Sequence, residues 1–161
     1  MIAPPPRKWT PRPHKHAVRL SALPIGDASH RDLGSGHGFT IGVKGESYRQ
    51  AALHALDAGR LQRGEEVTFM AALIPEPANP YDPNAIRVDI QGGAQVGYLS
   101  RDDAVRYRPV FEALTARHLI GVARAKLIGG VLPDWPSIGV MLDMHEPAEL
   151  LSTLEPGGQP F

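Results

Sequence analysis

Four tyrosines lie within one short part of the chain and could bind nucleic-acid bases. They are Tyr48, Tyr81, Tyr98 and Tyr107. An exposed aromatic ring stacks on any base, and each stack contributes ~1–3 kcal/mol. Tyr48 and Tyr98 are the better candidates for stacking. We expect Tyr81 and Tyr107 to pack against the domain with their hydroxyls at the surface.

Two arginines are candidates for contacts with phosphate groups. Arg87 lies on the polar side of an alternating segment, and Arg101 stands where a helix is expected to begin. Guanidinium groups are common partners of phosphate oxygens. The alternative for both residues is an ordinary solvated arginine on the surface.

One glycine-rich segment, residues 34–38, is similar to a phosphate-binding loop. Phe39 occupies the place where a dinucleotide-binding motif needs its last glycine, and no helix follows directly. The sequence has no Walker lysine motif either. We therefore expect no ATPase activity and no cofactor.

Metal-dependent chemistry is poorly supported. The chain has no cysteine, which excludes disulfides and thiolate metal sites. Its seven histidines include none at the helical spacing of a metal site with a third ligand nearby. Glu46, Asp102 and Asp103 are the candidates for a nuclease site, but aspartates at a helix start are better explained by capping and by the helix dipole. We expect no metal and no catalytic residue.

The hydrophobic pattern predicts a mostly β domain with two or three short helices. The clearest alternation sets Ile86, Val88 and Ile90 against Arg87 and Asp89. A two-glycine turn then leads into the next strand. The strands are expected at residues 39–43, 65–74, 86–90, 95–99, 120–129 and 137–144.

Three helices are expected between or after these strands. Ser47 and Gln50 form a possible capping box for the first helix, and Ser100 with Asp103 caps the second, which Pro109 is expected to interrupt. A third helix covers about residues 147–154. Short strands joined by tight turns favour a small curled sheet or a partly open barrel.

Charge and composition divide the chain into three parts. Residues 1–38 are a Pro- and Gly-rich arm with a net charge of +4, which we expect to be disordered; residues 39–129 carry +1 and residues 130–161 carry −5. A uniformly basic nucleic-acid binder is excluded, which leaves a local basic patch or merely solvated tails. Neither a signal peptide nor a run of ~20 apolar residues is present, so we expect a cytoplasmic protein.

Four segments in a fixed order resemble one known family. They are GESYRQ (45–50), NPYDPNAIRV (79–88), VGYL (96–99) and the helix from Arg101 onward. This set is similar to the HIRAN domain, over about residues 39–144, with residues 145–161 left as an acidic tail. The resemblance implies an OB-like or SH3-like small β-barrel that binds single-stranded DNA at its free 3′-hydroxyl end.

The resemblance also implies roles for individual residues. Tyr48 falls where the family stacks an aromatic ring on the terminal base, Asp82 where a carboxylate contacts the terminal hydroxyl, and Tyr98 where an aromatic or histidine stands beside a strand end. Ser47 replaces the basic residue that eukaryotic members carry. The phosphate contact would then be either missing or supplied by Lys44 or Arg49.

Asp82 has a chemical reason to occupy such a site. A carboxylate accepts a hydrogen bond from a free 3′-hydroxyl, at a charge-assisted strength of about 1.5–3 kcal/mol. It repels a 3′-phosphate or a continuing strand, so it selects ends by repulsion as well as by attraction. The alternative is that Asp82, between two prolines, only holds the turn through its side chain.

Three functions remain open at this point. The first is a DNA-end-binding module of repair or fork processing, which would need a separate helicase, ATPase or nuclease as partner. The second is a protein-interaction adaptor that uses the β surface or the Pro-rich arm. The third is a metal-dependent nuclease.

Overall fold

The computed structural model describes residues 30–130 and 137–154. The Pro-rich part of the predicted arm, residues 1–29, lies outside the described residues, as does the end of the predicted tail, residues 155–161. Within the described residues no helix is long and apolar enough to cross a membrane.

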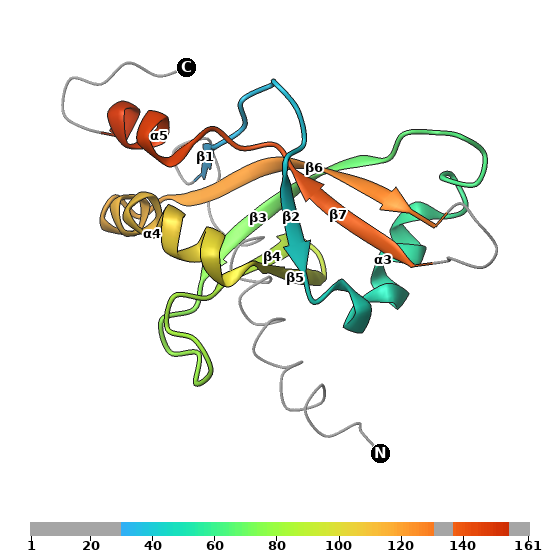
Figure 1. Ribbon diagram of the computed structural model, residues 1–161, viewed down its shortest axis with the longest axis horizontal. Helices are drawn as coiled ribbons and strands as arrows, with labels where there is room; N and C mark the ends of the chain where they lie inside the picture. Colours follow the sequence, from blue (N-terminus) through green and yellow to red (C-terminus); the bar gives the residue numbers. More distant parts are fainter. Residues whose placement is uncertain (1–29, 131–136, 155–161) are drawn as a thin grey trace.

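Six antiparallel strands form a closed barrel, in the order β6-β3-β4-β5-β2-β7 with β7 pairing back to β6 (Figure 1). The predicted small β-barrel is therefore confirmed, although it is closed rather than partly open. A seventh strand, β1, runs parallel to the first residues of β6. The strands are β1 His30–Asp32, β2 Ile41–Lys44, β3 Thr68–Pro75, β4 Ile86–Ile90, β5 Gln95–Leu99, β6 Ile120–Gly129 and β7 Ile138–Leu142.

The barrel interior is filled by the apolar side of each strand. Val88 on β4 and Val96 on β5 are fully buried, as is Leu73 on β3. These residues form one continuous core with side chains from the helices. Burial of this apolar area is the main stabilising contribution to the fold.

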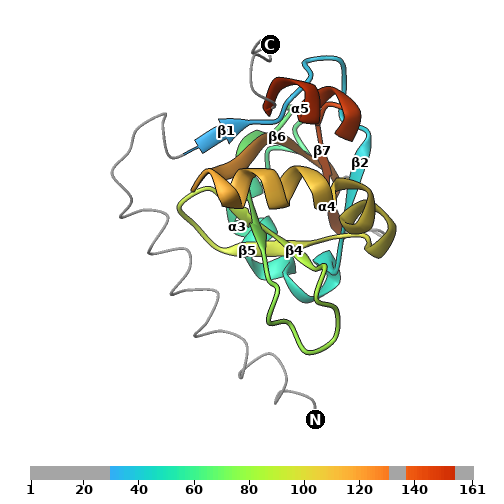
Figure 2. The same ribbon diagram turned by 90° about the vertical axis from the view of Figure 1, so that its left-hand side faces the viewer.

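Helix α4, Arg101–Ala116, lies along the outside of the barrel beside α5, Pro147–Leu154 (Figure 2). As predicted, the Ser100 hydroxyl caps α4 by accepting a hydrogen bond from the Asp103 amide at 3.1 Å. The predicted interruption is wrong, because α4 continues through Pro109. The face that includes the buried residues Tyr107 and Phe111 packs on the core, and this packing outweighs the hydrogen bond that proline removes.

The capping box predicted ahead of the first helix is also absent. A short 3-10 helix, η2 Glu46–Tyr48, precedes α3, Gln50–Asp57, and no side chain caps either one. The Gln50 amide instead pairs with the backbone of Ile138 on β7, donating to its carbonyl at 2.8 Å and accepting from its N–H at 2.8 Å. Gln50 thus attaches the start of α3 to the barrel.

The domain begins earlier than the boundary expected at residue 39. Residues 30–32 form β1, and Leu33 is fully buried in the core. The Asp143 carboxylate accepts hydrogen bonds from the Ser35 and Gly36 amides, at 3.1 and 2.8 Å, and from the Ser35 hydroxyl. Although partial burial raises the pKa of Asp143, these hydrogen bonds bring the net value below its ordinary range.

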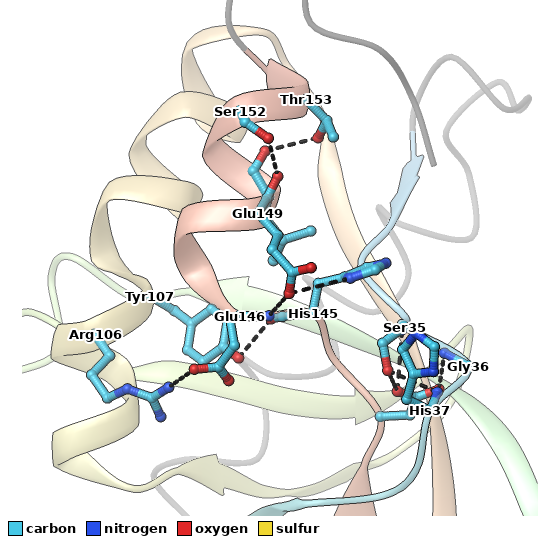
Figure 3. A network of polar contacts seen from close by, with 12 residues as sticks. Ser35, Gly36, His37, Arg106, Tyr107, His145, Glu146, Glu149, Ser152 and Thr153 are labelled. Carbon is cyan, nitrogen blue, oxygen red and sulfur yellow. Dashed lines mark hydrogen bonds and ion pairs between the residues drawn. The ribbon is translucent and has the colours of Figure 1, made fainter.

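The described part of the predicted acidic tail is also built into the domain. Figure 3 shows Glu146 paired with Arg106 of α4 at 3.0 Å, and His145 near Glu149 at 3.7 Å. The buried Tyr107 hydroxyl donates to the His145 carbonyl at 2.8 Å. The predicted helix at residues 147–154 is present, and its buried leucines join the core.

Candidate functional site

The β3–β4 loop, residues 76–85, contains most of the segment that carries the family resemblance. It projects from the barrel in both views (Figures 1 and 2). The Asn79 carboxamide oxygen accepts from the amides of Tyr81 and Asp82 at 2.8 and 3.2 Å. The Asp82 carboxylate accepts from the Asn84 amide at 2.9 Å through Oδ1. Side chains of the loop therefore fix its own backbone.

Asp82 holds the turn, as the alternative interpretation predicted, but only one of its oxygens is used. Oδ1 bonds the Asn84 amide, whereas no residue in the described ranges donates to Oδ2. The side chain is partly exposed. A structural role and a ligand contact are therefore compatible at this residue.

Two tyrosines extend into solvent at the edges of this region. Tyr48, at the end of η2, is 81% exposed, and Tyr81, in the β3–β4 loop, is 77% exposed. The expectation that Tyr81 packs against the domain is wrong, because the turn directs its side chain outward. Tyr107 does pack, but it is fully buried and its hydroxyl is not at the surface. Of the four tyrosines, Tyr48 and Tyr81 are thus the most exposed and the best placed for stacking.

Tyr98 lies between these two segments, on the outer face of the barrel. It stands opposite Lys44 on β2 and opposite Arg87 on β4, so the three side chains share one face. Lys44 leads into η2, whereas Glu76 opens the β3–β4 loop, and both neighbour Tyr98. The register therefore places the two exposed tyrosines on segments that flank Tyr98.

Gly97 explains why the VGYL segment needs a glycine. A Cβ atom at residue 97 would lie 2.3 Å from the Lys44 carbonyl oxygen. Any side chain there would push β5 away from β2 and disturb the row that contains Tyr98. This part of the family pattern is a packing requirement.

Arg87 is fully buried, so the prediction that it contacts phosphate is wrong, as is its alternative as a solvated arginine. Its guanidinium forms a two-point ion pair with Asp89, with distances of 2.9 and 3.0 Å, and a third contact of 3.0 Å with Glu76. Burial raises the pKa of Asp89, and the hydrogen bonds from Arg87 partly offset this effect. The strand pattern predicted the face on which Arg87 lies, but not that this face is covered.

Glu76 connects this buried pair to the loop, and sequence reasoning did not identify it. Its Oε1 accepts from the Tyr98 hydroxyl at 2.9 Å and from the side-chain Nδ2 of Asn79 at 3.0 Å. Its Oε2 accepts from the Arg87 guanidinium. Burial and the neighbouring carboxylate of Glu76 raise the pKa of Tyr98, so its hydroxyl remains a donor. Glu76 stands among prolines in a turn segment, which gave no signal of a partner.

The other three cations predicted to contact DNA, Lys44, Arg49 and Arg101, differ in exposure. Lys44 and Arg101 are exposed, and neither has an ion-pair or hydrogen-bond partner within the described part of the chain. Arg49 is partly buried and donates to the Gln95 carboxamide at 3.1 Å, and burial lowers the pKa of its guanidinium. Of these three predicted cations, Lys44 and Arg101 are therefore the most accessible to a ligand.

Two of the three carboxylates considered for a nuclease site have other contacts, whereas Asp102 is exposed at the start of α4. Asp103 pairs with Arg106 at 2.8 Å, and a Glu46 oxygen lies 3.4 Å from the Val140 amide. Among residues 30–130 and 137–154, no group of three histidines or carboxylates is arranged to hold a metal ion.

The chain is similar to a known domain family and to solved structures. No curated protein matches the chain. Among solved structures, a protein from Lactobacillus plantarum is 24% identical, with a TM-score of 0.39 over 65% of this chain and 88% of that one. The HIRAN domain of human HLTF is 23% identical, with a TM-score of 0.31 over 54% of this chain and 69% of that one. The HIRAN domain family matches residues 39–122, which include η2, the β3–β4 loop and β5. The chain belongs to the HIRAN domain family, a family of nucleic-acid-binding domains.

Proposed function

We propose that this domain binds single-stranded DNA at its free 3′-hydroxyl end. The observation that carries the proposal is the pair of exposed tyrosines, Tyr48 and Tyr81, on two segments that flank Tyr98. Asp82, with one carboxylate oxygen available, is the next residue after Tyr81. Stacking surfaces next to a hydrogen-bond acceptor suit a terminal nucleotide.

The tyrosines supply affinity that does not depend on sequence. Base stacking removes an exposed ring from water and tolerates any base. Tyr98 is half-buried, so it can offer only part of its ring, at the centre of the site. We assign stacking to Tyr48 and Tyr81 and a supporting contact to Tyr98.

Asp82 supplies selectivity for the end. Its Oδ2 accepts a hydrogen bond from the 3′-hydroxyl, whereas a 3′-phosphate would place a second anion beside it. A strand that continues past this point would meet the same repulsion. The turn that Asp82 forms with Asn84 fixes the direction of the carboxylate before DNA binds.

The phosphate contacts belong to Lys44 and Arg101, with Arg49 as a more restricted third candidate. Exposed cations beside stacking platforms attract the backbone of single-stranded DNA. Arg87 contributes differently, because it holds the strands and the loop in place from within. Its charge is already balanced by Asp89 and Glu76.

In this proposal the domain is a binding module of DNA repair or replication-fork processing in the cytoplasm. Unwinding or cleavage of the bound strand would be performed by a separate helicase, ATPase or nuclease. Purified protein should therefore hydrolyse neither ATP nor DNA. Magnesium-dependent cleavage that disappears in the Asp102→Ala variant would contradict this assignment.

The test compares oligonucleotides that differ only at the 3′ terminus. Fluorescence anisotropy with a 5′ label should show tighter binding of the 3′-hydroxyl strand than of the 3′-phosphate strand. Equal affinity for both would refute end recognition and leave plain single-strand binding. Absence of binding to either would favour the adaptor function.

A further inference from the structure

Glu76 occupies the entrance of the β3–β4 loop, where the chain leaves the barrel. It follows Pro75, the last residue of β3, and its amide donates to the Ala85 carbonyl at 2.9 Å. This bond joins the two ends of the loop directly before β4 begins. A side chain at this position can therefore reach both the barrel and the loop.

The Glu76 carboxylate uses both of its oxygens for this purpose. It accepts from three donors, which are the Tyr98 hydroxyl on β5, the Arg87 guanidinium on β4 and the Asn79 amide in the loop. The side chain is only 20% exposed. Such charge-assisted hydrogen bonds are stronger than bonds between neutral groups, and partial burial protects them from water.

Asn79 extends the connection to the residues that would meet the DNA end. Its amide nitrogen donates to Glu76, and its carboxamide oxygen accepts from the backbone of Tyr81 and Asp82. Each link is a hydrogen bond of 3.2 Å or less. A continuous path therefore runs from β4 and β5 through Glu76 and Asn79 to the proposed recognition residues.

We propose that Glu76 is the positioning residue that determines end selectivity, because it fixes the direction of Asp82 relative to Tyr98. This inference rests on the proposed function. Glu76 contributes to that function by positioning Asp82, without contacting the DNA itself. Asp82 discriminates between a hydroxyl and a phosphate only when its carboxylate is held in one place. A loop released from Glu76 would still expose Tyr81, and so would keep stacking while losing selectivity.

A carboxylate is needed at this position because all three neighbouring groups are donors. In Glu76→Gln one oxygen becomes an amide nitrogen, which is itself a donor and faces Arg87, Tyr98 or Asn79. At least one of the three bonds is then lost, with little change in side-chain volume. Glu66→Gln is the matched control, since Glu66 is an exposed carboxylate whose ion pair, with Lys126 on β6, is 3.4 Å long.

The experiment measures the ratio of affinities for the 3′-hydroxyl and 3′-phosphate strands. Glu76→Gln should lower this ratio about tenfold to hundredfold, as expected for the loss of one charge-assisted hydrogen bond. Affinity for the 3′-phosphate strand should change little, and Glu66→Gln should keep the native ratio. If Glu76→Gln does not fold, Tyr98→Phe removes one of the three donors and should lower the ratio about twofold.

A double-variant comparison separates positioning from simple destabilisation. In an Asp82→Asn background, Glu76→Gln should cause no further loss of selectivity, because the residue that it positions is already altered. If the native protein discriminates between the ends and folded Glu76→Gln does so equally well, the role of Glu76 is refuted. If the native protein shows no discrimination, the proposed function itself fails.

Discussion

The β3–β4 loop and strand β4 share one family motif but show opposite environments. In the loop, Tyr81 is 77% exposed and Asp82 keeps one oxygen free of partners among the described residues. In β4, a few residues later, Arg87 and Asp89 are 0% and 1% exposed and pair with each other. The loop leaves an aromatic ring and a carboxylate oxygen exposed, whereas the charges of the strand are paired with each other and with Glu76.

This difference shows that a family motif combines two kinds of requirement. A buried arginine paired with an aspartate cannot reach a phosphate, so its presence in the motif reflects the fold. An exposed tyrosine that contributes no core contact is not required by the fold, and our proposal explains Tyr81 by base stacking. Burial distinguishes the requirement of the fold from the requirement of a ligand. The pattern of residue types alone does not report burial.

Removing the charge of Arg87 should have the largest effect. Arg87→Met leaves Asp89 buried without its partner and should lower the free energy of unfolding by about 3–5 kcal/mol. Arg101→Ala, at an exposed arginine, should change it by less than about 0.5 kcal/mol. Urea denaturation measures both. An Arg87 variant of native stability that binds DNA poorly would instead make Arg87 a ligand contact.

Alkaline pH should lower the stability of the domain through its buried tyrosine hydroxyls. Burial raises the pKa of Tyr107 to about 12, and burial with the nearby Glu76 carboxylate raises that of Tyr98. The unfolded chain releases these protons near pH 10, so the stability that both tyrosines contribute is complete below about pH 10 and is lost as the pH rises toward about 12. Denaturation at increasing pH should show a smaller decline for Tyr98→Phe and Tyr107→Phe. A decline parallel to that of the native protein would contradict this origin.

Truncating the exposed tyrosines should affect binding and spare the fold. Tyr48→Ala and Tyr81→Ala should each weaken single-stranded DNA binding by about 1–3 kcal/mol, while Tyr48→Phe and Tyr81→Phe keep most of the affinity. Tyr107→Ala, at the buried tyrosine, should instead lower stability by about 3–5 kcal/mol. Anisotropy and thermal melting on the same samples distinguish these outcomes. Native affinity in both alanine variants would remove the stacking proposal.

Salt should have a modest effect on binding, because the proposal assigns the main phosphate contacts to two cations of the described residues. With Lys44 and Arg101 as the main contacts, about two phosphates are neutralised, and the slope of log K against log salt should be about −1.4. Lys44→Ala should make the slope shallower by about 0.7. A much steeper slope would show that other cations, such as those of the arm, contact the DNA.

The parts of the fold predicted best have strong local periodicity. The strand predicted at residues 120–129 and the helix predicted at residues 147–154 match β6 and α5. The segment from residue 30 to residue 37 was missed because it is polar and glycine-rich. Its order comes from distant partners, namely β6 and the Asp143 carboxylate.

The candidate site was predictable in its motif but not in its division of roles. The resemblance selected Tyr48 and Asp82, which the structure shows to be exposed and partly exposed, and the strand pattern placed Arg87 on the correct face. Neither the burial of Arg87 nor the outward direction of Tyr81 follows from alternation. The first depends on contacts with Glu76 and Asp89, and the second on the turn that Asn79 holds. Glu76 was missed since its three partners are separated in sequence and meet only in the folded barrel.

The most direct test of the account compares Asp82→Asn with the native protein on both kinds of end. The native domain should prefer the 3′-hydroxyl strand to the 3′-phosphate strand. Asp82→Asn keeps an oxygen for the Asn84 amide and removes the negative charge, so it should lose most of that preference while retaining much of its affinity for the 3′-phosphate strand. An Asp82→Asn variant of native stability with the full native preference would contradict end recognition by Asp82.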